Sequence, residues 1–559
     1  MQQAEPSTLL LCAGRLSHVA VPMALSASNA MLPIGGRPVI AWTLDALREQ
    51  GVGSVTIVAR QDDDELPAFV EQVYGNRVRA TIARVPAEGG SIVHSLAAGL
   101  RATPGNGPVR LLLGDTLVND PLDAAPDFVY AAPVPHPQRW CVVRTDGDGR
   151  IDSLHDKQPL PGHDHMALVG YYRFDDGDVL RAAVADAEQR QARELSAVLL
   201  GYGARRGGMA VLPAARWHDF GNVDSLAKAR FELLQPREFN HVRIDRAVHS
   251  ITKRSRDGAK LRAEAAWFEA LPPALRLLAP RLIDSGEDGS RADGPWAYYT
   301  LEYYGYPTLA ELYVCGRILP EIWDAILRRV LDVQALFAAH PGALVPGAAR
   351  TMYGSKTRER LAALQRQHPE WRWLFAESVE LDGRTVPGIP AVLRALDPWV
   401  DHLEATLTPG ICHGDLCFSN VLFDVGSQIV RVIDPRGSFG EVSLYGDPRY
   451  DLAKMRHSVC GWYDFIVAGY VHVRQLDEAA FALDWNVPET ARTTAEFFDE
   501  LLEERGLPAR EIHLIEALLF LTMAPLHNDV PSRQRVMALH GLRLFDEATR
   551  DAAPEIRAG

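Results

Sequence analysis

Three polar residues stand between apolar runs in one short stretch of the chain. In HGDLCFSNVLFDVGSQIVRVIDPRG, residues 413–437, Asp415 is followed five positions later by Asn420, and Asp434 closes the next apolar run. A carboxylate can orient an attacking hydroxyl and accept its proton, while an amide and a second carboxylate offer the oxygen ligands that Mg²⁺ prefers. The spacing predicts metal-assisted phosphoryl transfer, with Asp415 catalytic and Asn420 and Asp434 on the metal. A turn in which these side chains only cap the backbone is the alternative.

The pattern of predicted strands and helices differs between the first and second parts of the chain. Residues 1 to about 230 alternate short β-type runs, such as SVTIVAR, with amphipathic runs, such as RPVIAWTLDALREQG. This alternation predicts an α/β fold with a doubly wound, mostly parallel sheet, whose ligands gather at the carboxyl ends of the strands. From about residue 238 the pattern changes to β-type runs, a helix around residues 261–271, the aromatic strand WAYYTLEYYGY and then long helices. We therefore predict two domains, 1–235 and 236–559.

The overall composition limits the kinds of partner. At 559 residues the chain is too long for one hydrophobic core, and 58 Lys and Arg against 72 Asp and Glu leave a net charge of −14. This balance argues against nucleic-acid binding and against anionic membranes, so small molecules are the expected substrates. No apolar stretch reaches the roughly 18 residues of a membrane span. The six cysteines lack CxxC spacing, so neither a zinc site nor a disulfide framework is expected, and a cytoplasmic location fits best.

The stretch around Asp415 resembles a known group of kinases. HGDLCFSNVLF followed by VIDPRG is similar to the aminoglycoside phosphotransferase and choline kinase group, over roughly residues 238–540. The resemblance implies a two-lobed α+β, kinase-like fold that uses ATP. In SITKRS it would place Lys253 on the third strand of the small lobe. In LRAEAAWFEALP it would place Glu264 on the following helix, where the two side chains pair and orient the ATP phosphates.

The same resemblance assigns an adenine site and a supporting carboxylate. The run YYTLEYYG would form the hinge that meets adenine, with Glu302 and Tyr304 as binding residues. In GDPRYDLAK, Asp451 would stand as a structural carboxylate behind the site. No glycine-rich loop precedes Lys253, which is a common departure in this family. A surface lysine is the alternative interpretation of Lys253, and its position before EAAWFEALP favours the functional one.

The first domain resembles a second family. LLLCAG and the later LPIGGRPVIAWTLDAL begin like a sugar-phosphate nucleotidylyltransferase, in which a strand runs into a glycine-rich loop that holds the triphosphate of the incoming nucleotide. The resemblance implies nucleotide binding by Gly14 and Arg15. The sequence departs from the family where residues 16–18 read LSH in place of Gly, Thr and Arg, and where residues 28–29 read SN in place of Pro-Lys.

Two carboxylates of the first domain match the metal ligands of that family. LLLGD ends a strand with Asp115, and RWHDFGNVDSLAKA carries Asp219 in a pattern similar to W-x-D-x-G. Together they would hold one Mg²⁺ that counters charge while a phosphate attacks the α-phosphate of the nucleotide. The candidates to replace the charge of the missing lysine are Arg15, His18 and Arg37.

Other positions match the parts of the family site that meet the base and the acceptor. EGGS, residues 88–91, opens a helix like the segment that approaches the base. The turn HDKQP and the strand ALVGYYRF resemble the two segments that contact the acceptor. The residues that this resemblance adds to the binding set are Glu88, Gly89, Gly90, Lys157 and Gly170.

Two activities in one chain predict consecutive steps. The kinase would phosphorylate a sugar or small polar alcohol with ATP, and the first domain would join that phosphate to the NMP unit of a second NTP. Such a product is an activated precursor for surface polysaccharide. The alternative is a kinase whose first domain has lost catalysis and only binds a nucleotide or related ligand. The sequence does not identify the acceptor or the oligomeric state, and it does not indicate whether the second NTP is CTP, UTP or GTP.

Overall fold

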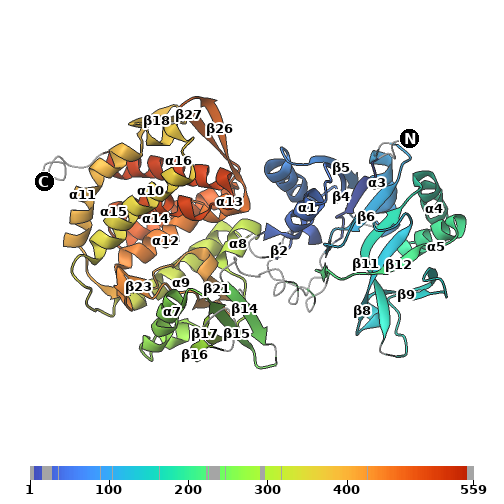
Figure 1. Cartoon of the computed structure of the whole chain (residues 1–559), viewed down its shortest axis with the longest axis horizontal. Helices are drawn as coiled ribbons and strands as arrows, with labels where there is room; N and C mark the ends of the chain where they lie inside the picture. The colour runs from blue at the N-terminus through green and yellow to red at the C-terminus, as the bar shows by residue number, and fades with distance from the viewer. Residues whose placement is uncertain are drawn as a thin grey trace. The chain divides into compact units, whose positions relative to one another are not determined.

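The computed structural model divides the chain into two compact units, one up to Leu234 and one that holds nearly all residues from Gln235 on (Figure 1). The described residues are 5–14, 28–34, 37–87, 90–103, 105–162, 164–221, 225, 229, 240–245, 247–289, 296–316, 318–424 and 426–550. The predicted boundary, between residues 235 and 236, lies outside them.

A nine-stranded sheet forms the centre of the first unit. Its parallel part has the order β6-β1-β4-β5, formed by β6 (Val109–Leu113), β1 (Ser7–Leu11), β4 (Ser54–Arg60) and β5 (Arg79–Val85). Strands β1, β4 and β6 are buried almost continuously, as their apolar runs require, whereas the edge strand β5 is mostly exposed. Next to β6, β11 (His165–Phe174) runs antiparallel and continues the sheet. The predicted α/β, parallel-rich sheet is confirmed, and its far half is antiparallel.

Helices cover both faces of this sheet. Figure 1 shows α1 (Val39–Glu49) on one side of the strands and α4 (Gly177–Gln189) and α5 (Leu195–Arg206) on the other. Helix α3 (Ile92–Ala102) packs against β1, β4 and β5, and its Gly99 permits this approach, because a Cβ there would lie 2.8 Å from a methyl carbon of β1. The remaining described elements are η1 (Asn29–Met31), β2 (Pro33–Ile34), β3 (Arg37–Pro38), α2 (Glu65–Phe69), η2 (Val70–Tyr74), β7 (Thr116–Val118), β8 (Phe128–Val134), η3 (Pro137–Arg139), β9 (Cys141–Thr145), β10 (Ile151–Asp156), β12 (Ala210–Pro213) and β13 (Trp217–Asp219).

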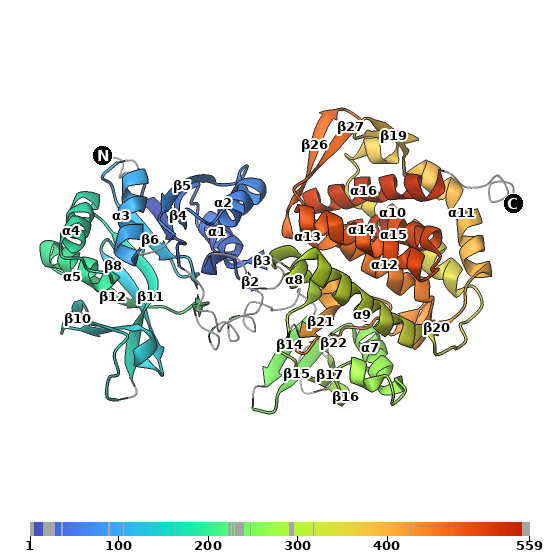
Figure 2. The ribbon, with the colours of Figure 1, turned by 180° about the vertical axis from the view of Figure 1, so that it is seen from behind.

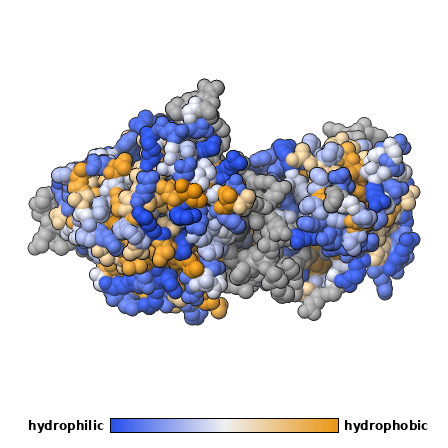
Figure 3. Space-filling model, turned by 90° about the horizontal axis from the view of Figure 1, so that it is seen from below, coloured by the Kyte–Doolittle hydropathy of each residue, from blue (hydrophilic) through white to orange (hydrophobic). Residues whose placement is uncertain are grey.

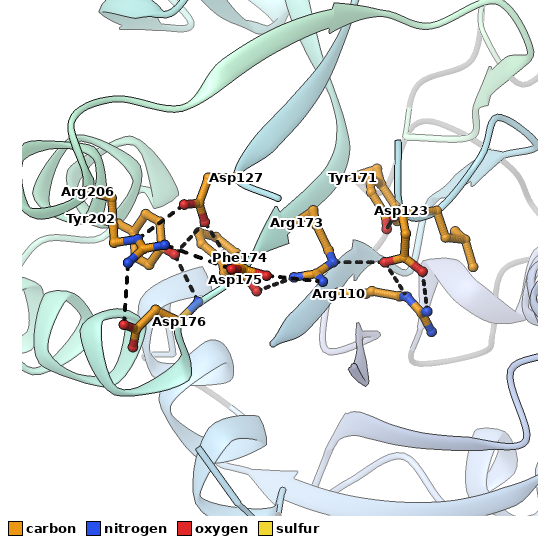
Figure 4. A network of polar contacts seen from close by, with 11 residues as sticks. Arg110, Asp123, Asp127, Tyr171, Arg173, Phe174, Asp175, Asp176, Tyr202 and Arg206 are labelled. Atoms are coloured by element: carbon orange, nitrogen blue, oxygen red, sulfur yellow. Dashed lines mark hydrogen bonds and ion pairs between the residues drawn. The ribbon is translucent and has the colours of Figure 1, made fainter. Parts of the chain in front are cut away.

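A network of charged and phenolic side chains joins the sheet to a helix of this unit (Figure 4). Asp123 accepts hydrogen bonds from Arg110 of β6, at 3.1 Å, and from Arg173 of β11, at 2.8 Å. Asp127, just before β8, accepts a hydrogen bond from Tyr202 of α5. Both arginines are buried, so Asp123 offsets the cost of removing their charges from water. The network holds β6, the strand that leads into the candidate site, in place.

The second unit begins with an antiparallel sheet. Its order is β14-β15-β17-β16, formed by β14 (Asn240–Asp245), β15 (Ser250–Ser255), β17 (Trp296–Glu302) and β16 (Leu282–Asp288), and α7 (Gly258–Ala270) packs against it. Lys253 therefore lies on β15, the second strand of this sheet among the described residues. Its expected place on a third strand stays a prediction, because residues 230–239, before β14, lie outside the described part of the chain. Only β14 precedes Lys253 in that part, where the family's glycine-rich loop would require a further strand.

The rest of the second unit is mainly helical. Figure 2 shows α10 (Lys356–Gln367), α12 (Pro448–Val459), α14 (Glu489–Glu504), α15 (Ala509–Met523) and α16 (Pro531–Thr549) packed together beside the sheet. The other described elements are η4 (Arg276–Leu278), α8 (Leu309–Cys315), α9 (Pro320–Ala338), η5 (Arg350–Ser355), η6 (Arg372–Phe375), β18 (Ser378–Leu381), β19 (Arg384–Pro387), α11 (Ile389–Ala405), β20 (Gly410–Ile411), η7 (Phe418–Asn420), β21 (Val421–Asp424), β22 (Ile429–Val432), β23 (Ser438–Phe439), β24 (Glu441–Val442), β25 (Tyr445–Gly446), α13 (Tyr463–Ala468), β26 (Val471–Asp477), β27 (Ala480–Trp485) and η8 (Ala524–Leu526).

The visible surface is mixed in character. The view from below shows hydrophilic side chains interspersed with apolar ones on both units (Figure 3). Within the described part of the chain, no helix combines the length and the apolar character needed to cross a membrane.

Candidate active sites

Asp415 lies in the second unit on the short segment between β20 and β21. Its Oδ1 is 2.8 Å from the Nζ of Lys454, a buried residue of α12. Burial raises the pKa of Asp415, but the charges of Lys454 and Arg436 have the larger, opposite effect, so the pKa lies well below its usual range. The side chain is therefore a carboxylate at neutral pH, as a group that receives a proton from an attacking hydroxyl must be.

Asn420 is held against Asp415. Its Nδ2 donates to the backbone oxygen of Asp415 at 2.9 Å and to Oδ2 at 3.1 Å. The η7 turn brings the two residues together across five positions of sequence. Because both of these contacts use the amide nitrogen, the amide oxygen is the atom left for a cation.

Lys253, Glu264 and Asp434 meet at one point of the second unit. Lys253 Nζ is 2.7 Å from Glu264 Oε2 and 3.2 Å from Asp434 Oδ1. Burial lowers the pKa of Lys253, but the two carboxylates raise it more, so the amine stays charged. Tyr299 donates a 2.9 Å hydrogen bond to the same Glu264 oxygen. Asp434 has 47% of its side chain exposed, so it stands where the buried pair opens to solvent.

The predicted adenine residues lie at the end of β17. The hydroxyl of Tyr304 donates to the carboxylate of Glu302 at 3.0 Å, and the guanidinium carbon of Arg431 lies 5.3 Å from the centre of the Tyr304 ring. Strand β17 pairs with β15, where Lys253 stands opposite Tyr299. The sheet therefore holds Glu302 and Tyr304 on the strand next to Lys253.

Asp451 supports the backbone that carries Asp415. Its carboxylate accepts the N–H groups of His413, at 2.7 Å, and Gly414, at 2.8 Å. Burial raises the pKa of Asp451 to about 6, and these hydrogen bonds oppose the rise. Gly414 has φ 75°, and a Cβ there would lie 2.8 Å from the Cβ of Arg436. The turn before Asp415 thus requires glycine.

A cavity of about 360 Å³ opens in the first unit at the carboxyl ends of β1, β4 and β6. Its lining includes Gly14 after β1, Arg60 at the end of β4, Asp115 after β6, and Ser91 before α3. Ser91 caps α3 by accepting the N–H of His94 at 3.3 Å. Ligands of α/β proteins bind at this edge of the sheet, and the first turn of a helix favours phosphate.

Asp115 and Asp219 face the same point. Strand β13 pairs with β7 so that Asp219 lies opposite Thr116. A Cβ placed on Gly221 would be 3.2 Å from Asp115 Oδ2 and 3.3 Å from Asp219 Oδ1. Burial raises the pKa of Asp115, and burial together with the charge of Asp115 raises that of Asp219 to about 7. A divalent cation would relieve this concentration of buried negative charge.

Asn29 occupies the position of the family lysine and contacts one of these carboxylates. Its Nδ2 donates to Asp115 Oδ2 at 3.3 Å, and its N–H donates to the oxygen of Gly14 at 3.2 Å. Ser28 Oγ donates to the oxygen of Cys12 at 2.7 Å. These bonds fix residues 28 and 29 against the end of β1 without supplying a positive charge.

Arg60 is a candidate that the sequence analysis missed. It is 3% exposed; its Nη1 donates to the oxygen of Ala13 at 3.1 Å, and its Nε lies 2.9 Å from Asp62 Oδ1. Its Nη2 has no hydrogen-bond partner among the described residues. Because Arg60 lines the cavity, its buried guanidinium places a positive charge beside any phosphate that binds there. The signal in the sequence was the arginine that closes the strand SVTIVAR.

Lys157 and Gly170 affect the site of Asp115 and Asp219 differently, one by its charge and the other by its lack of a side chain. The positive charge of Lys157, which follows β10, acts on Asp115 and opposes the rise that burial causes in its pKa. Gly170 has φ 89° within β11, and a Cβ there would lie 3.0 Å from Thr116 Cγ2. Gly170 therefore lets β11 approach the loop of Asp115, while Lys157 reaches the site by its charge.

The other predicted residues of the first unit divide into three groups. Gly90 lines the cavity. Arg37 instead pairs with Asp45 of α1 and donates to Tyr74 at 3.2 Å, away from the cavity lining. The predicted positions outside the described residues are Arg15, His18, Glu88 and Gly89.

The donor sets of both sites fit Mg²⁺. Asn420 and Asp434 offer one amide and one carboxylate oxygen, and Asp115 and Asp219 offer two partly buried carboxylates. Within the described ranges, no group of three or more His, Cys, Asp or Glu side chains is arranged to hold a metal. Pairs of ligands suit Mg²⁺, which usually takes one or two carboxylates and completes its shell with phosphates and water.

Family comparisons divide the chain as its structure does. Residues 9–200 match the MobA-like NTP transferase domain, and residues 241–483 match the phosphotransferase enzyme family. Three curated relatives, each a glucose-1-phosphate thymidylyltransferase, align with the first part. The protein of Actinoplanes sp. is 25% identical over 39% of this chain and 76% of its own length. That of Streptomyces griseus is 25% identical (41% and 66%), and that of Mycolicibacterium smegmatis is 26% identical (37% and 75%).

Solved structures were found for the same part of the chain. A chain described as a glucose-1-phosphate thymidylyltransferase from Bacillus anthracis, in complex with a sucrose, has 18% identity and a TM-score of 0.37, and it covers 42% of this chain and 97% of its own. A UDP-glucose pyrophosphorylase complexed with UDP-glucose has 17% identity and a TM-score of 0.36, covering 42% and 99%.

Proposed function

We propose that this enzyme, which joins an N-terminal NTP transferase domain to a C-terminal phosphotransferase domain, carries out two consecutive reactions on one acceptor. The C-terminal domain phosphorylates a hydroxyl of a sugar or small polar alcohol with ATP. The N-terminal domain then transfers an NMP unit to that phosphate and releases pyrophosphate. The product is an activated precursor for surface polysaccharide. The observation that carries the proposal is the presence in one chain of a paired Lys253–Glu264–Asp434 group and a two-carboxylate cavity at the ends of parallel strands.

In the phosphorylation step, the residues of the second unit have separate roles. Lys253, kept charged and rigid by Glu264, binds phosphate oxygens of ATP. Asp415 orients the acceptor hydroxyl and takes its proton as the oxygen bonds to the γ-phosphorus and ADP leaves. Asn420 and Asp434 hold Mg²⁺, which would neutralise charge on the phosphates. Glu302 and Tyr304 border the adenine site.

In the nucleotidyl step, an oxygen of the acceptor phosphate bonds to the α-phosphorus of the NTP, and pyrophosphate leaves. Asp115 and Asp219 hold the metal, and the backbone around Gly14 binds the triphosphate. Arg60 supplies the positive charge that Asn29 lacks, because the residue lines the cavity and its guanidinium is buried beside the end of β1. The neighbouring Lys157 contributes its charge from the acceptor side.

The names of the three curated relatives indicate which nucleotide and which acceptor should be tested first. Each of the three is named a glucose-1-phosphate thymidylyltransferase. This adds dTTP to CTP, UTP and GTP as the second nucleotide, and hexose 1-phosphates to the acceptors to be tested. A cytoplasmic location fits both reactions, since ATP and NTPs are available there.

A kinase with an inactive N-terminal domain is the second candidate function. The observation that favours it is Asn29, whose amide takes the lysine position and contacts Asp115 without bringing a charge. In that case the cavity binds a nucleotide or a related ligand and the chain releases no pyrophosphate.

Mass spectrometry of complete reactions separates the two candidates. The full chain is incubated with ATP, Mg²⁺, each second NTP and a panel of sugars and amino alcohols. We expect one acceptor to gain a phosphate and then an NMP unit. With Asp415→Asn the product should form only when the acceptor phosphate is supplied, and with Asp115→Ala the phosphate should accumulate. If the acceptor is phosphorylated but never gains an NMP, and no pyrophosphate is released, only the kinase activity is supported and the second candidate function is correct.

A further inference from the structure

Four basic side chains lie near one another beside Asp415, and we call them the basic cluster: Lys356, Arg360, Arg436 and Lys454. Lys356 and Arg360 stand one turn apart at the start of α10, Arg436 follows β22, and Lys454 lies in α12. Lys454 contacts Asp415 directly at 2.8 Å. The charges of the other three members act on Lys356, and Asp415 is the one acid that acts on it with them. The cluster therefore lies beside the group that receives the acceptor hydroxyl.

Contacts between distant elements hold the cluster in place. Arg360 donates to a backbone oxygen at 3.2 Å, and Lys454 Nζ lies 3.4 Å from a sulfur; both partners belong to residues 522–523 at the end of α15. Arg436 Nη1 donates to the hydroxyl of Tyr450 at 2.8 Å, and Tyr450 stands one turn before Lys454 in α12. The positive charges thus converge from two helices and a loop, with the end of α15 supplying uncharged partners, and they do not share one solvated face.

The charge of the cluster is not balanced by the protein. Lys356 is half-buried and has no hydrogen bond or ion pair with any described residue. Burial, then Arg436, Arg360 and Lys454, lower its pKa to about 7. Arg360 has the exposed Glu359 as its neighbouring acid, and burial and Arg436 lower its pKa as well. Like charges held this closely in a partly buried place are unfavourable unless an anion joins them.

We propose that the basic cluster is an acceptor subsite that binds an oxyanion, a carboxylate or a phosphate, carried by the molecule whose hydroxyl is phosphorylated. This inference rests on the proposed kinase function and narrows its substrate class from sugars and polar alcohols in general to acidic ones. Lys356 and Arg360 contact the anion, while Lys454 and Arg436 also hold Asp415. A cationic acceptor, such as an amino sugar, is repelled by the same side chains.

The ATP phosphates are the other anions near Asp415. They have their own cation in Lys253, which is tied to Glu264 and Asp434 on the strand side of the site. The charges that most affect the pKa values of Lys356 and Arg360 come from the basic cluster and its acidic neighbours, and Lys253 is not one of these main charges. The two sets of cations therefore serve different ligands, and substitution of Lys356 should affect the acceptor and leave ATP unaffected.

Steady-state phosphorylation by the full chain tests the subsite. The acceptors are a matched series: glucose, glucosamine, glucuronic acid and glucose 6-phosphate. We expect kcat/KM to be highest for one of the two acids, and the better of the two identifies carboxylate or phosphate. Lys356→Met and Arg360→Gln should each raise the KM for that acid by about tenfold or more, with the KM for ATP within about twofold of the wild type. Lys356→Arg should restore most of the loss.

Arg366→Gln is the matched control, because it removes a charge from the exposed end of the same helix. It should leave both KM values unchanged. The subsite is ruled out if glucose or glucosamine is the best acceptor, or if Lys356→Met raises the KM for ATP or affects all four acceptors equally. Those results would leave the kinase function intact. If neither this series nor the wider panel of acceptors is phosphorylated, the kinase assignment is wrong, and the proposed acceptor subsite is wrong as well.

Discussion

The two candidate sites differ in how closely their residues follow the families they resemble. In the second unit, Lys253 is within hydrogen-bond distance of both Glu264 and Asp434, and Asn420 is bonded to Asp415. The first unit keeps its pair of carboxylates and loses the lysine beside them. The difference suggests that carboxylates at strand ends are fixed by the sheet itself, whereas a phosphate-binding cation can be supplied from another strand, as with Arg60 of β4.

The largest effect should come from Asp415→Asn. Without the carboxylate, phosphoryl transfer should fall by about a thousandfold, because proton transfer to a side chain contributes about 10²–10⁴ in rate. The Kd for ATP should change little, since Lys253 and Asp434 remain. Coupled ADP release and equilibrium binding measure the two quantities.

Asp424→Asn is the control for that substitution and should behave as the wild type, because Asp424 lies in a partly exposed turn and the amide oxygen of asparagine can still accept the N–H of Ser427. Wild-type turnover by Asp415→Asn would remove the role given to Asp415 and, with it, the close agreement of the second unit with its family.

Asp115→Ala and Asp219→Ala should each reduce pyrophosphate release by about a hundredfold or more, because each leaves the metal with one protein ligand. Kinase turnover should be unchanged in both variants. Asp120→Ala is a poor control because Asp120 binds the backbone of residues 215 and 216, so exposed Asp148→Ala is used. Unaltered pyrophosphate release in both would show that the first unit does not use this site.

Arg60→Gln tests whether the missing lysine has a replacement. We expect a loss of about 2–4 kcal/mol of transition-state stabilisation in nucleotidyl transfer, the size found when one charge-stabilising donor is removed. Arg60→Lys should keep most of the activity, and thermal unfolding of both variants separates charge from folding. Asn29→Lys should rescue Arg60→Gln in part. If Arg60→Gln is as active as the wild type, Arg60 does not replace the charge of the missing lysine.

The pH dependence of acceptor binding should be smaller. Lys356 has a pKa lowered to about 7, so it is charged below that value and neutral above it. Binding of an acidic acceptor should therefore weaken from pH 6 to pH 9, by about threefold to tenfold, while the arginines and Lys454, with Asp415 opposite them, keep their charges. Lys356→Arg should flatten the profile of KM against pH. A wild-type KM that falls as pH rises would contradict the role of Lys356.

Separation of the two units should have the smallest effect. Fragments 1–235 and 236–559 should each fold, with activities within about twofold of the full chain, since each unit has its own sheet and core. Limited proteolysis and calorimetry measure this. One cooperative unfolding transition, with neither fragment soluble, would show that the chain is a single folding unit.

The sequence alone determined the order of the two folds and most of the site residues that lie at strand ends or in local turns. Hydrophobic period is a local property, so the runs before Asp115 and Asp434 could be identified as strands without knowledge of their neighbours. The spacing of Asp415 and Asn420 is likewise contained in one turn. The antiparallel half of the first sheet was not predicted, because strand direction depends on which strands pair, and the chain's alternation of strands and helices does not state it.

Only the tertiary structure decided where the positive charges lie. Arg60 meets the end of β1 across 47 positions of sequence, and Lys454 meets Asp415 from a separate helix. The pKa of Lys356 is lowered by burial and then by Arg436, Arg360 and Lys454, and two of these three charges come from other elements, so no local pattern marks it. Long basic side chains can reach a site from many backbone positions, whereas a short carboxylate must stand almost at the site. The physical reach of the side chain therefore explains why the fold located Arg60, Lys356 and Lys454, whereas Lys253 was found in the sequence only through its resemblance to a family motif.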